Sequence, residues 1–285
     1  MDNSPITNPF DEDEKTGRRP IVWAMLGLAA MCCGLAFVVA IFYFQPDAQS
    51  LIDQYFPSAT PTASSTPVST ATNTPTSTPN WTATAQVENA ETAMNEATNW
   101  DVVLADTFDT NENDWLTESS DDEYASTNYE VVDGTYRWTT EAHQSFIGWV
   151  RSDTDPLTDF YISVDIVQVE GPDTADYGVL FREDEDSNFY YFAVSEQGNY
   201  ALYIYYEGWD TLIDWTESDL ILRGESNRIT MIGEGAHFTF FINDQYLTDF
   251  IDDRIPEGII ALAVELSEEG DQAVFEFDNF ELRVP

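Results

Sequence analysis

The chain has 285 residues and a formal net charge of −43, with 53 acidic residues against 10 basic ones. A surface of this charge repels nucleic-acid phosphates and anionic lipid head groups, which excludes nucleic-acid binding. Cations and neutral molecules are the expected ligands. The residues after position 100 include 43 of the acidic residues but only seven arginines and no lysine. Such a negative charge is also typical of an exported protein whose charged surface keeps it soluble.

The first expected element is a membrane anchor. Residues 21–44, IVWAMLGLAAMCCGLAFVVAIFYF, carry no charge and are long enough to span a bilayer with some tilt. Three basic residues precede this segment and none follows it before Arg137. The positive-inside rule therefore predicts a cytoplasmic tail over 1–20, a signal-anchor helix over 21–44 in the cell membrane, and an extracellular C-terminal part. A cleavable signal peptide is the alternative, but it requires a shorter apolar core and a small-residue cleavage site.

A linker follows the anchor over residues 45–98. Its stretch 57–86, PSATPTASSTPVSTATNTPTSTPNWTATAQ, is rich in Thr, Ser and Pro and cannot bury enough apolar surface to offset its conformational entropy. The prolines favour extended conformations, so we expect a disordered stalk that holds the next domain away from the membrane. The segment 86–97, QVENAETAMNEA, has the composition of a short helix at the end of the stalk.

The remaining residues, 99–285, read as one domain of strands. Short runs of β-branched and aromatic residues, such as FYISVDIVQVE, NFYYFAVS, YALYIYY and GIIALAVEL, alternate with turns rich in Gly, Asp and Asn. About fourteen candidate strands without a long amphipathic helix predict an all-β sandwich. Gly198 lies between two aromatic runs, which predicts a hairpin with its turn at that glycine.

These runs also carry a family resemblance. DTFDTNENDW, YEVVDGTYRW, YGVLFREDEDSNFYYFAVSEQGNYALY, NRITMIGEGAHFTFFINDQYL and the closing FDNFELRV occur in this order over residues 101–285. The pattern resembles the bacterial extracellular concanavalin A-like lectin and glucanase domains, a group that includes laminin-G-like modules and 3-keto-disaccharide hydrolase domains. The resemblance implies a two-sheet jelly roll in which one sheet often faces carbohydrate.

The resemblance does not extend to a glucanase active site. Retaining glucanases of this group carry a Glu-x-Asp-x-x-Glu strand, and the nearest equivalent here, SVDIVQ, has Ser163 and Gln168 in place of the two glutamates, with only Asp165 matching. We therefore expect no catalytic residues and favour a lectin-like, carbohydrate-binding module. The alternatives are a glycoside-processing enzyme of the 3-keto-disaccharide hydrolase type and a structural or sensory ectodomain that binds another protein.

One calcium ion is a further expectation. Both cysteines, Cys32 and Cys33, lie in the apolar segment, so the domain has no thiolate ligands. In DTNEND, oxygen-bearing side chains recur at alternate positions as in a calcium loop, although the glycine and glutamate of an EF-hand are missing. A Ca²⁺ bound by Asp106, Asp109 and Asp278 would tie the first strand to the last; the alternative is a solvated Asx turn.

The alternation of side chains along each strand predicts the ligand-binding face. Leu202 and Ile204 mark the core side of YALYIYY, which turns Tyr203 and Tyr205 to the other face. The same reasoning on neighbouring runs gives a candidate site of Asp165, Arg182, Tyr191, Tyr203, Tyr205, Trp209 and Trp215. Rings of this kind stack on sugar faces while a carboxylate and a guanidinium hold hydroxyl groups. The alternatives are a tyrosine ladder with an Asp165 to Arg182 ion pair, and a face buried against another element.

Overall fold

The computed structural model describes residues 81–285 of the chain, with side chains described from residue 84. The predicted cytoplasmic tail, the predicted transmembrane segment 21–44 and most of the predicted stalk lie outside this range. None of the helices within residues 81–285 combines the length and the apolar composition that crossing a bilayer requires. Membrane anchoring and N-in orientation therefore remain predictions.

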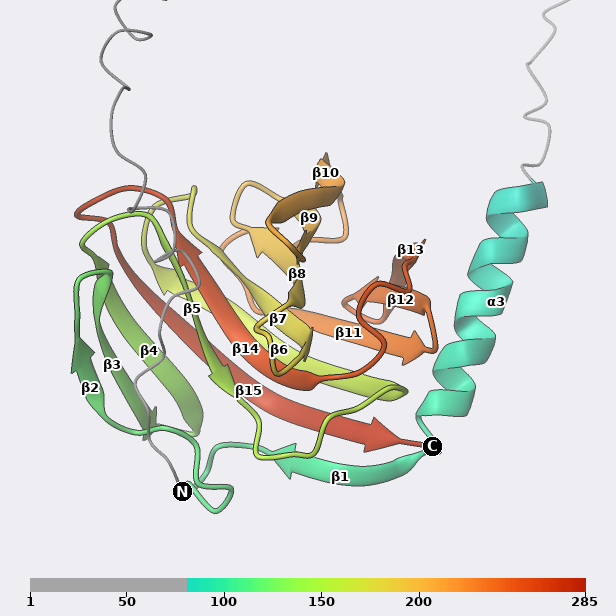
Figure 1. Cartoon of the computed structure of the whole chain (residues 1–285), viewed down its shortest axis with the longest axis horizontal. Helices are drawn as coiled ribbons and strands as arrows, with labels where there is room; N and C mark the ends of the chain where they lie inside the picture. Colours follow the sequence, from blue (N-terminus) through green and yellow to red (C-terminus); the bar gives the residue numbers. More distant parts are fainter. Residues whose placement is uncertain (1–80) are drawn as a thin grey trace, which may run out of the picture. The chain divides into compact units, whose positions relative to one another are not determined.

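The strands form two antiparallel sheets that face each other as a sandwich, which confirms the predicted all-β jelly-roll class (Figure 1). The larger sheet has nine strands in the order β13-β12-β11-β6-β15-β4-β3-β2, with β1 paired to β15. Its strands are β1 (Asp101–Asp106), β2 (Ser119–Asp121), β3 (Ala125–Val132), β4 (Thr135–Ala142), β6 (Phe160–Glu170), β11 (Asn227–Glu234), β12 (His237–Ile242), β13 (Gln245–Ile251) and β15 (Gln272–Val284).

The smaller sheet has six strands in the order β10-β9-β8-β7-β14-β5. They are β5 (Phe146–Arg151), β7 (Asp176–Glu183), β8 (Phe189–Ser195), β9 (Asn199–Tyr205), β10 (Trp209–Glu217) and β14 (Ile259–Leu266). The predicted hairpin joins β8 to β9. Gly198 lies in its turn with φ of 81°, a left-handed conformation that glycine adopts without a steric penalty.

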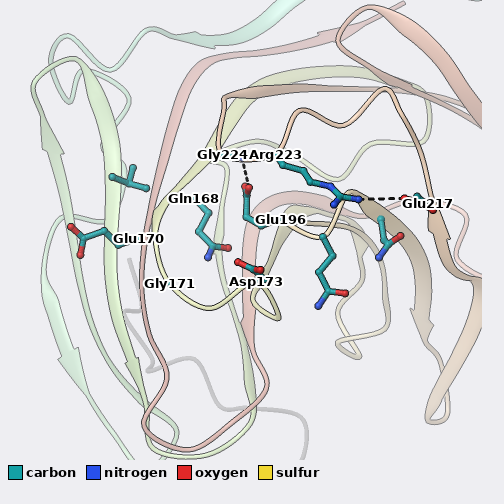
Figure 2. A pocket seen from close by; sticks show the side chains of 11 residues that line it. Gln168, Glu170, Gly171, Asp173, Glu196, Glu217, Arg223 and Gly224 are labelled. Carbon is teal, nitrogen blue, oxygen red and sulfur yellow. Dashed lines mark hydrogen bonds and ion pairs between the residues drawn. The ribbon is translucent and has the colours of Figure 1, made fainter.

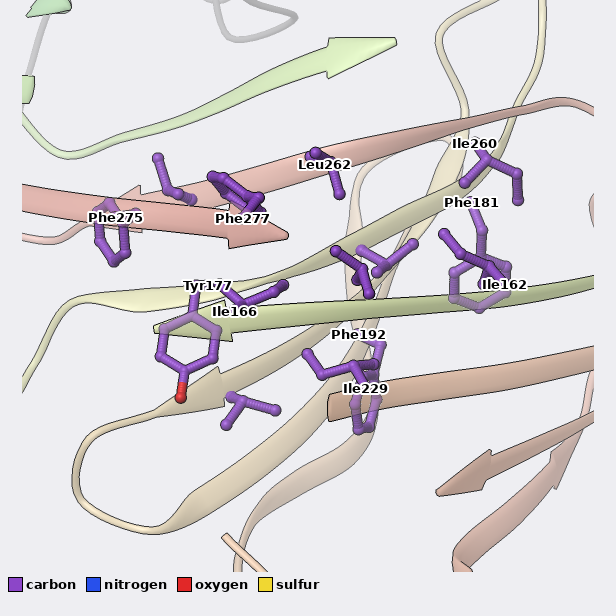
Figure 3. Packing of buried hydrophobic residues seen from close by; sticks show 14 of the residues in the cluster. Ile162, Ile166, Tyr177, Phe181, Phe192, Ile229, Ile260, Leu262, Phe275 and Phe277 are labelled. Carbon is purple, nitrogen blue, oxygen red and sulfur yellow. The ribbon is translucent and has the colours of Figure 1, made fainter. Parts of the chain in front are cut away.

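The core lies between the two sheets because each strand turns alternate side chains inward (Figure 3). From the larger sheet Ile162 and Phe277 enter this core, and from the smaller sheet Phe181, Phe192 and Leu262 meet them. All five are fully buried. Leu202 and Ile204 are buried in the same core, as the alternation in YALYIYY predicts.

Helix α3 (Trp81–Ala97) precedes the first strand and begins five residues before the predicted helix 86–97. Its residues Ala90 and Ala97 pack against Tyr161, Ile232 and Phe241, which lie on β6, β11 and β12. Figure 1 shows α3 beside this end of the larger sheet. The helix therefore covers part of the side of the nine-stranded sheet that points away from the core.

Candidate functional site

The face of the six-stranded sheet that points away from the core, here called the outer face, has a central row of small residues. Cross-strand pairing aligns Ala263, Gly178, Ala193 and Ala201 on β14, β7, β8 and β9. Residues directly opposite one another in antiparallel strands share a face. A Cβ atom added at Gly178 would lie 1.9 Å from the carbonyl oxygen of Phe192, so the backbones approach too closely for any other residue there.

Aromatic rings lie on one side of this row. Pairing aligns Tyr191 with Tyr203, and Phe189 with Tyr205 and Trp209. The Tyr203 ring centroid lies 6.3 Å from that of Trp209 and 6.3 Å from that of Trp215, in edge-to-face arrangements. The structure therefore brings together five of the seven predicted site residues.

These five residues differ in how much solvent they meet. Trp209 and Trp215 are 41% and 42% exposed, Tyr203 and Tyr205 are partly exposed, and Tyr191 is fully buried. We call Tyr203, Tyr205, Trp209 and Trp215 the aromatic patch, because all four side chains are at least partly exposed. Tyr191 lies on the predicted face but is covered by its neighbours in a cluster with Leu180 and Trp149.

Arg182 does not lie on this face, and its predicted exposure is wrong. Its φ of 54° is in the left-handed region, which interrupts the strand alternation on which the prediction rested. The guanidinium lies over the Phe238 ring, with Cζ 4.6 Å from the ring centroid. It donates hydrogen bonds to the backbone carbonyls of Ile255, Thr158 and Gly235. Arg182 is fully buried and holds three loops together.

Asp165 does not lie on this face either, so its predicted place in the ligand site is wrong, and so is the alternative of an ion pair with Arg182. Asp165 lies on β6, opposite Arg228 of β11. The Arg228 guanidinium donates two hydrogen bonds to the Asp165 carboxylate, at 2.7 and 2.9 Å, and Asn279 donates a third. Asp165 therefore stabilises the nine-stranded sheet and is not near the aromatic patch.

Two carboxylates that the sequence reasoning missed lie on the outer face instead. Asp176 of β7 and Glu265 of β14 are paired directly opposite each other. Asp176 is 6% exposed and Glu265 is partly exposed. The alternation that assigned Tyr203 to this face could have found them, since Asp176 shares the parity of Gly178, and Glu265 that of Ala263. We call these two residues the acidic pair.

The environment of the acidic pair changes how its members ionise. Burial, reinforced by the charge of Glu265, raises the pKa of Asp176 to about 8. Burial also raises the pKa of Glu265. The pKa of Tyr203 is raised to about 12 by burial and by the charges of Glu265 and Asp176. Both carboxyl groups therefore ionise less readily than solvated ones, and a cation bound beside them would favour their ionised forms.

A polar pocket of about 720 Å³ lies at the end of the sandwich (Figure 2). The pocket and Asp176 of the acidic pair lie along the same row of paired residues. This row runs across β7, β8, β9 and β10 through Asp176, Ser195, Asn199 and Glu217. The last two of these residues line the pocket.

The side chains in this pocket carry oxygen atoms that can accept hydrogen bonds. Figure 2 shows Gln168, Asp173 and Glu196 close together. Gln168 is 7% exposed and donates to the Pro172 carbonyl, whereas its Oε1 atom is buried without a hydrogen-bond partner. Glu196 accepts a hydrogen bond from the Gly224 amide, and burial followed by the charge of Asp173 raises its pKa.

The residues expected to bind calcium have other contacts. The Asp106 carboxylate accepts hydrogen bonds from the Phe108 amide, the Asn113 side chain and the Trp115 indole, at 2.7, 2.7 and 2.9 Å. Burial, followed by the charges of Asp165 and Asp109, raises the pKa of Asp278. Within residues 81–285 no group of three or more His, Cys, Asp or Glu side chains is arranged to hold a metal ion. The calcium ion stays a prediction.

The sandwich has the fold of concanavalin A-like carbohydrate-binding modules and glycoside hydrolases. An endo-β-galactosidase from Clostridium perfringens that releases GlcNAcα1-4Gal is similar, with a TM-score of 0.50 and 9% identity over 65% of this chain and 63% of that chain. The carbohydrate-binding module CBM66 from Bacillus subtilis gives 0.45 and 18% identity, over 61% and 98%. A β-glucanase from Bacillus licheniformis gives 0.47 and 10%, over 64% and 97%. At such identities these likenesses concern the fold alone.

A match over most of the domain shows the family to which the chain belongs. Residues 99–283 match the model of the 3-keto-alpha-glucoside-1,2-lyase-like domain, and the chain belongs to this family. The match confirms the resemblance read from the sequence. No curated protein matches the chain.

Proposed function

We propose that the sandwich is a carbohydrate-binding module, held outside the cell by the predicted anchor at 21–44. The observation that carries this proposal is the position of Tyr203 between Trp209 and Trp215 on the outer face. Partly exposed rings grouped in this way offer apolar surfaces on which the C–H faces of a pyranose can stack. The adjacent pocket adds carboxylate and amide groups that can orient hydroxyl groups.

A glycan array probed with the full chain in detergent tests this proposal. Tyr203→Ala and Tyr205→Ala should each weaken binding of a retained glycan by about 1 kcal/mol or more, because each removes a stacking surface. Tyr206→Ala is the matched control, since Tyr206 is an exposed tyrosine outside the aromatic patch. Binding by the double variant that equals binding by the parent would overturn the assignment of this face.

Glycoside processing is a second candidate function. The family match favours it, because the family is described as 3-keto-alpha-glucoside-1,2-lyase-like. Incubation of the full chain with 3-keto-α-glucosides, followed by chromatography of the products, tests for turnover. Release of product at a rate proportional to protein concentration would establish that the domain is an enzyme. Binding of the glycoside without turnover would favour carbohydrate binding as the function.

A further inference from the structure

The acidic pair lacks a counter-cation within the described part of the chain. Asp176 and Glu265 form no hydrogen bond or ion pair with residues 84–285. No lysine occurs in this range. The arginines there bind elsewhere: Arg182 on backbone carbonyls, and the others as Arg137–Glu276, Arg151–Glu183, Arg223–Glu217, Arg228–Asp165, Arg254–Asp252 and Arg283–Glu281. His143 and His237 lie beside Asp121 and Asp249.

Two buried polar groups of the outer face also lack partners, and one of them, Tyr191, is close enough to the pair to interact with its charges. The Tyr191 hydroxyl and the Trp149 Nε1 atom are buried without a hydrogen-bond partner, in side chains that are 0% and 2% exposed. Burial, together with the charges of both carboxylates, raises the pKa of the Tyr191 hydroxyl well above its ordinary value. Trp149 lies opposite Ala263 in the row of small residues. Leaving buried donors unpaired costs free energy.

We propose that the acidic pair receives a protonated amine carried by the saccharide ligand of this domain. An ammonium group donates hydrogen bonds to both carboxylates and supplies the missing positive charge. The aromatic patch next to the pair suits an organic cation, because aromatic faces attract positive charge. Glu265 and Tyr203 are partly exposed, so the amine can approach from solvent. The Tyr191 hydroxyl is buried beneath its neighbours but interacts with the charges of both carboxylates, so it belongs to the same polar cluster.

A metal ion fits this position less well than an amine. Calcium takes six to eight oxygen ligands, whereas the site offers two carboxylates with one buried hydroxyl nearby. No larger group of metal-ligating side chains occurs within residues 81–285. The proposal rests on carbohydrate binding by the outer face and specifies the class of sugar, an amino sugar with a free amine.

The test compares two trisaccharides that differ only in the amine: the β-1,4-linked glucosamine trimer and its fully N-acetylated form. Isothermal titration calorimetry at pH 6 with the full chain should give about tenfold tighter binding of the free-amine trimer, the gain expected for a charge-assisted hydrogen bond. Asp176→Asn and Glu265→Gln should each abolish most of this preference. Asp101→Asn, which makes the same charge change at an exposed position in the other sheet, should keep it.

Each other outcome has a definite meaning. Equal affinity for the two trimers overturns the amine proposal and leaves carbohydrate binding intact. A preference that all three variants retain reflects the overall negative charge and also overturns it. Calcium binding that is lost in Asp176→Asn and Glu265→Gln makes the pair a metal site instead. If neither trimer nor any glycan of the array binds, carbohydrate binding itself is refuted.

Discussion

Asp176 and Glu265 face each other across β7 and β14, two carboxyl groups on one side of a sheet without a basic residue between them. Burial raises the pKa of Asp176 from its ordinary 3.8 to about 8. As the pH rises through this window, the unfolded chain releases the proton before the folded one does. The folded state is therefore stabilised by this group at low pH and loses that stability toward pH 8.

Asp176→Asn should accordingly raise the midpoint of thermal unfolding at pH 8, and the gain should shrink toward pH 4. We expect a stabilisation of at least about 1 kcal/mol at pH 8, since one pKa unit corresponds to about 1.4 kcal/mol. Melting curves of parent and variant at several pH values measure this, with Asp101→Asn as the control. A difference that stays constant with pH would show that Asp176 does not carry the effect.

Arg182 should be among the most sensitive positions of the domain. Arg182→Met leaves the carbonyls of Ile255 and Thr158 without their donor, and buried polar groups left unpaired are costly. We expect a loss of about 3 kcal/mol or more in urea unfolding. Arg223→Met is the control, because the Arg223 side chain is 59% exposed. Similar losses in both variants would contradict the structural role of Arg182.

Calcium binding is decided by thermal melts in millimolar Ca²⁺ and in chelator. An ion held by Asp106, Asp109 and Asp278 at a hundred times its Kd would stabilise the domain by about 2.7 kcal/mol. Asp278→Asn should remove that gain. An unchanged midpoint eliminates the site, in agreement with the three hydrogen bonds that already occupy Asp106.

The orientation in the membrane is tested with protease on intact cells. Because the basic residues cluster before the apolar segment 21–44, the N-terminus should stay protected while a fragment containing the sandwich is released. A tag at each end, detected by immunoblot, reports the two outcomes. Cleavage of the N-terminal tag in unbroken cells, or full protection of the C-terminal one, refutes the N-in orientation.

The sequence by itself determined the class of fold and which side chains of an individual strand point toward the core. Leu202 and Tyr203 take opposite sides of β9 because neighbouring side chains of any extended strand must do so. This local rule holds without knowledge of the partners, and it placed Tyr203 and Tyr205 on the outer face correctly. The order of turns and strands likewise carried the resemblance that the family match confirms.

Only the tertiary structure decided which strands share a sheet and where the alternation breaks. Asp165 and Tyr203 both face away from the core, yet β6 and β9 belong to different sheets, and alternation does not say which. The positive φ of Arg182 depends on the loops whose carbonyls it binds. Asp176 meets Glu265 through strand pairing between segments far apart in the chain. Such contacts depend on register and packing across the whole sandwich, which local sequence patterns do not encode.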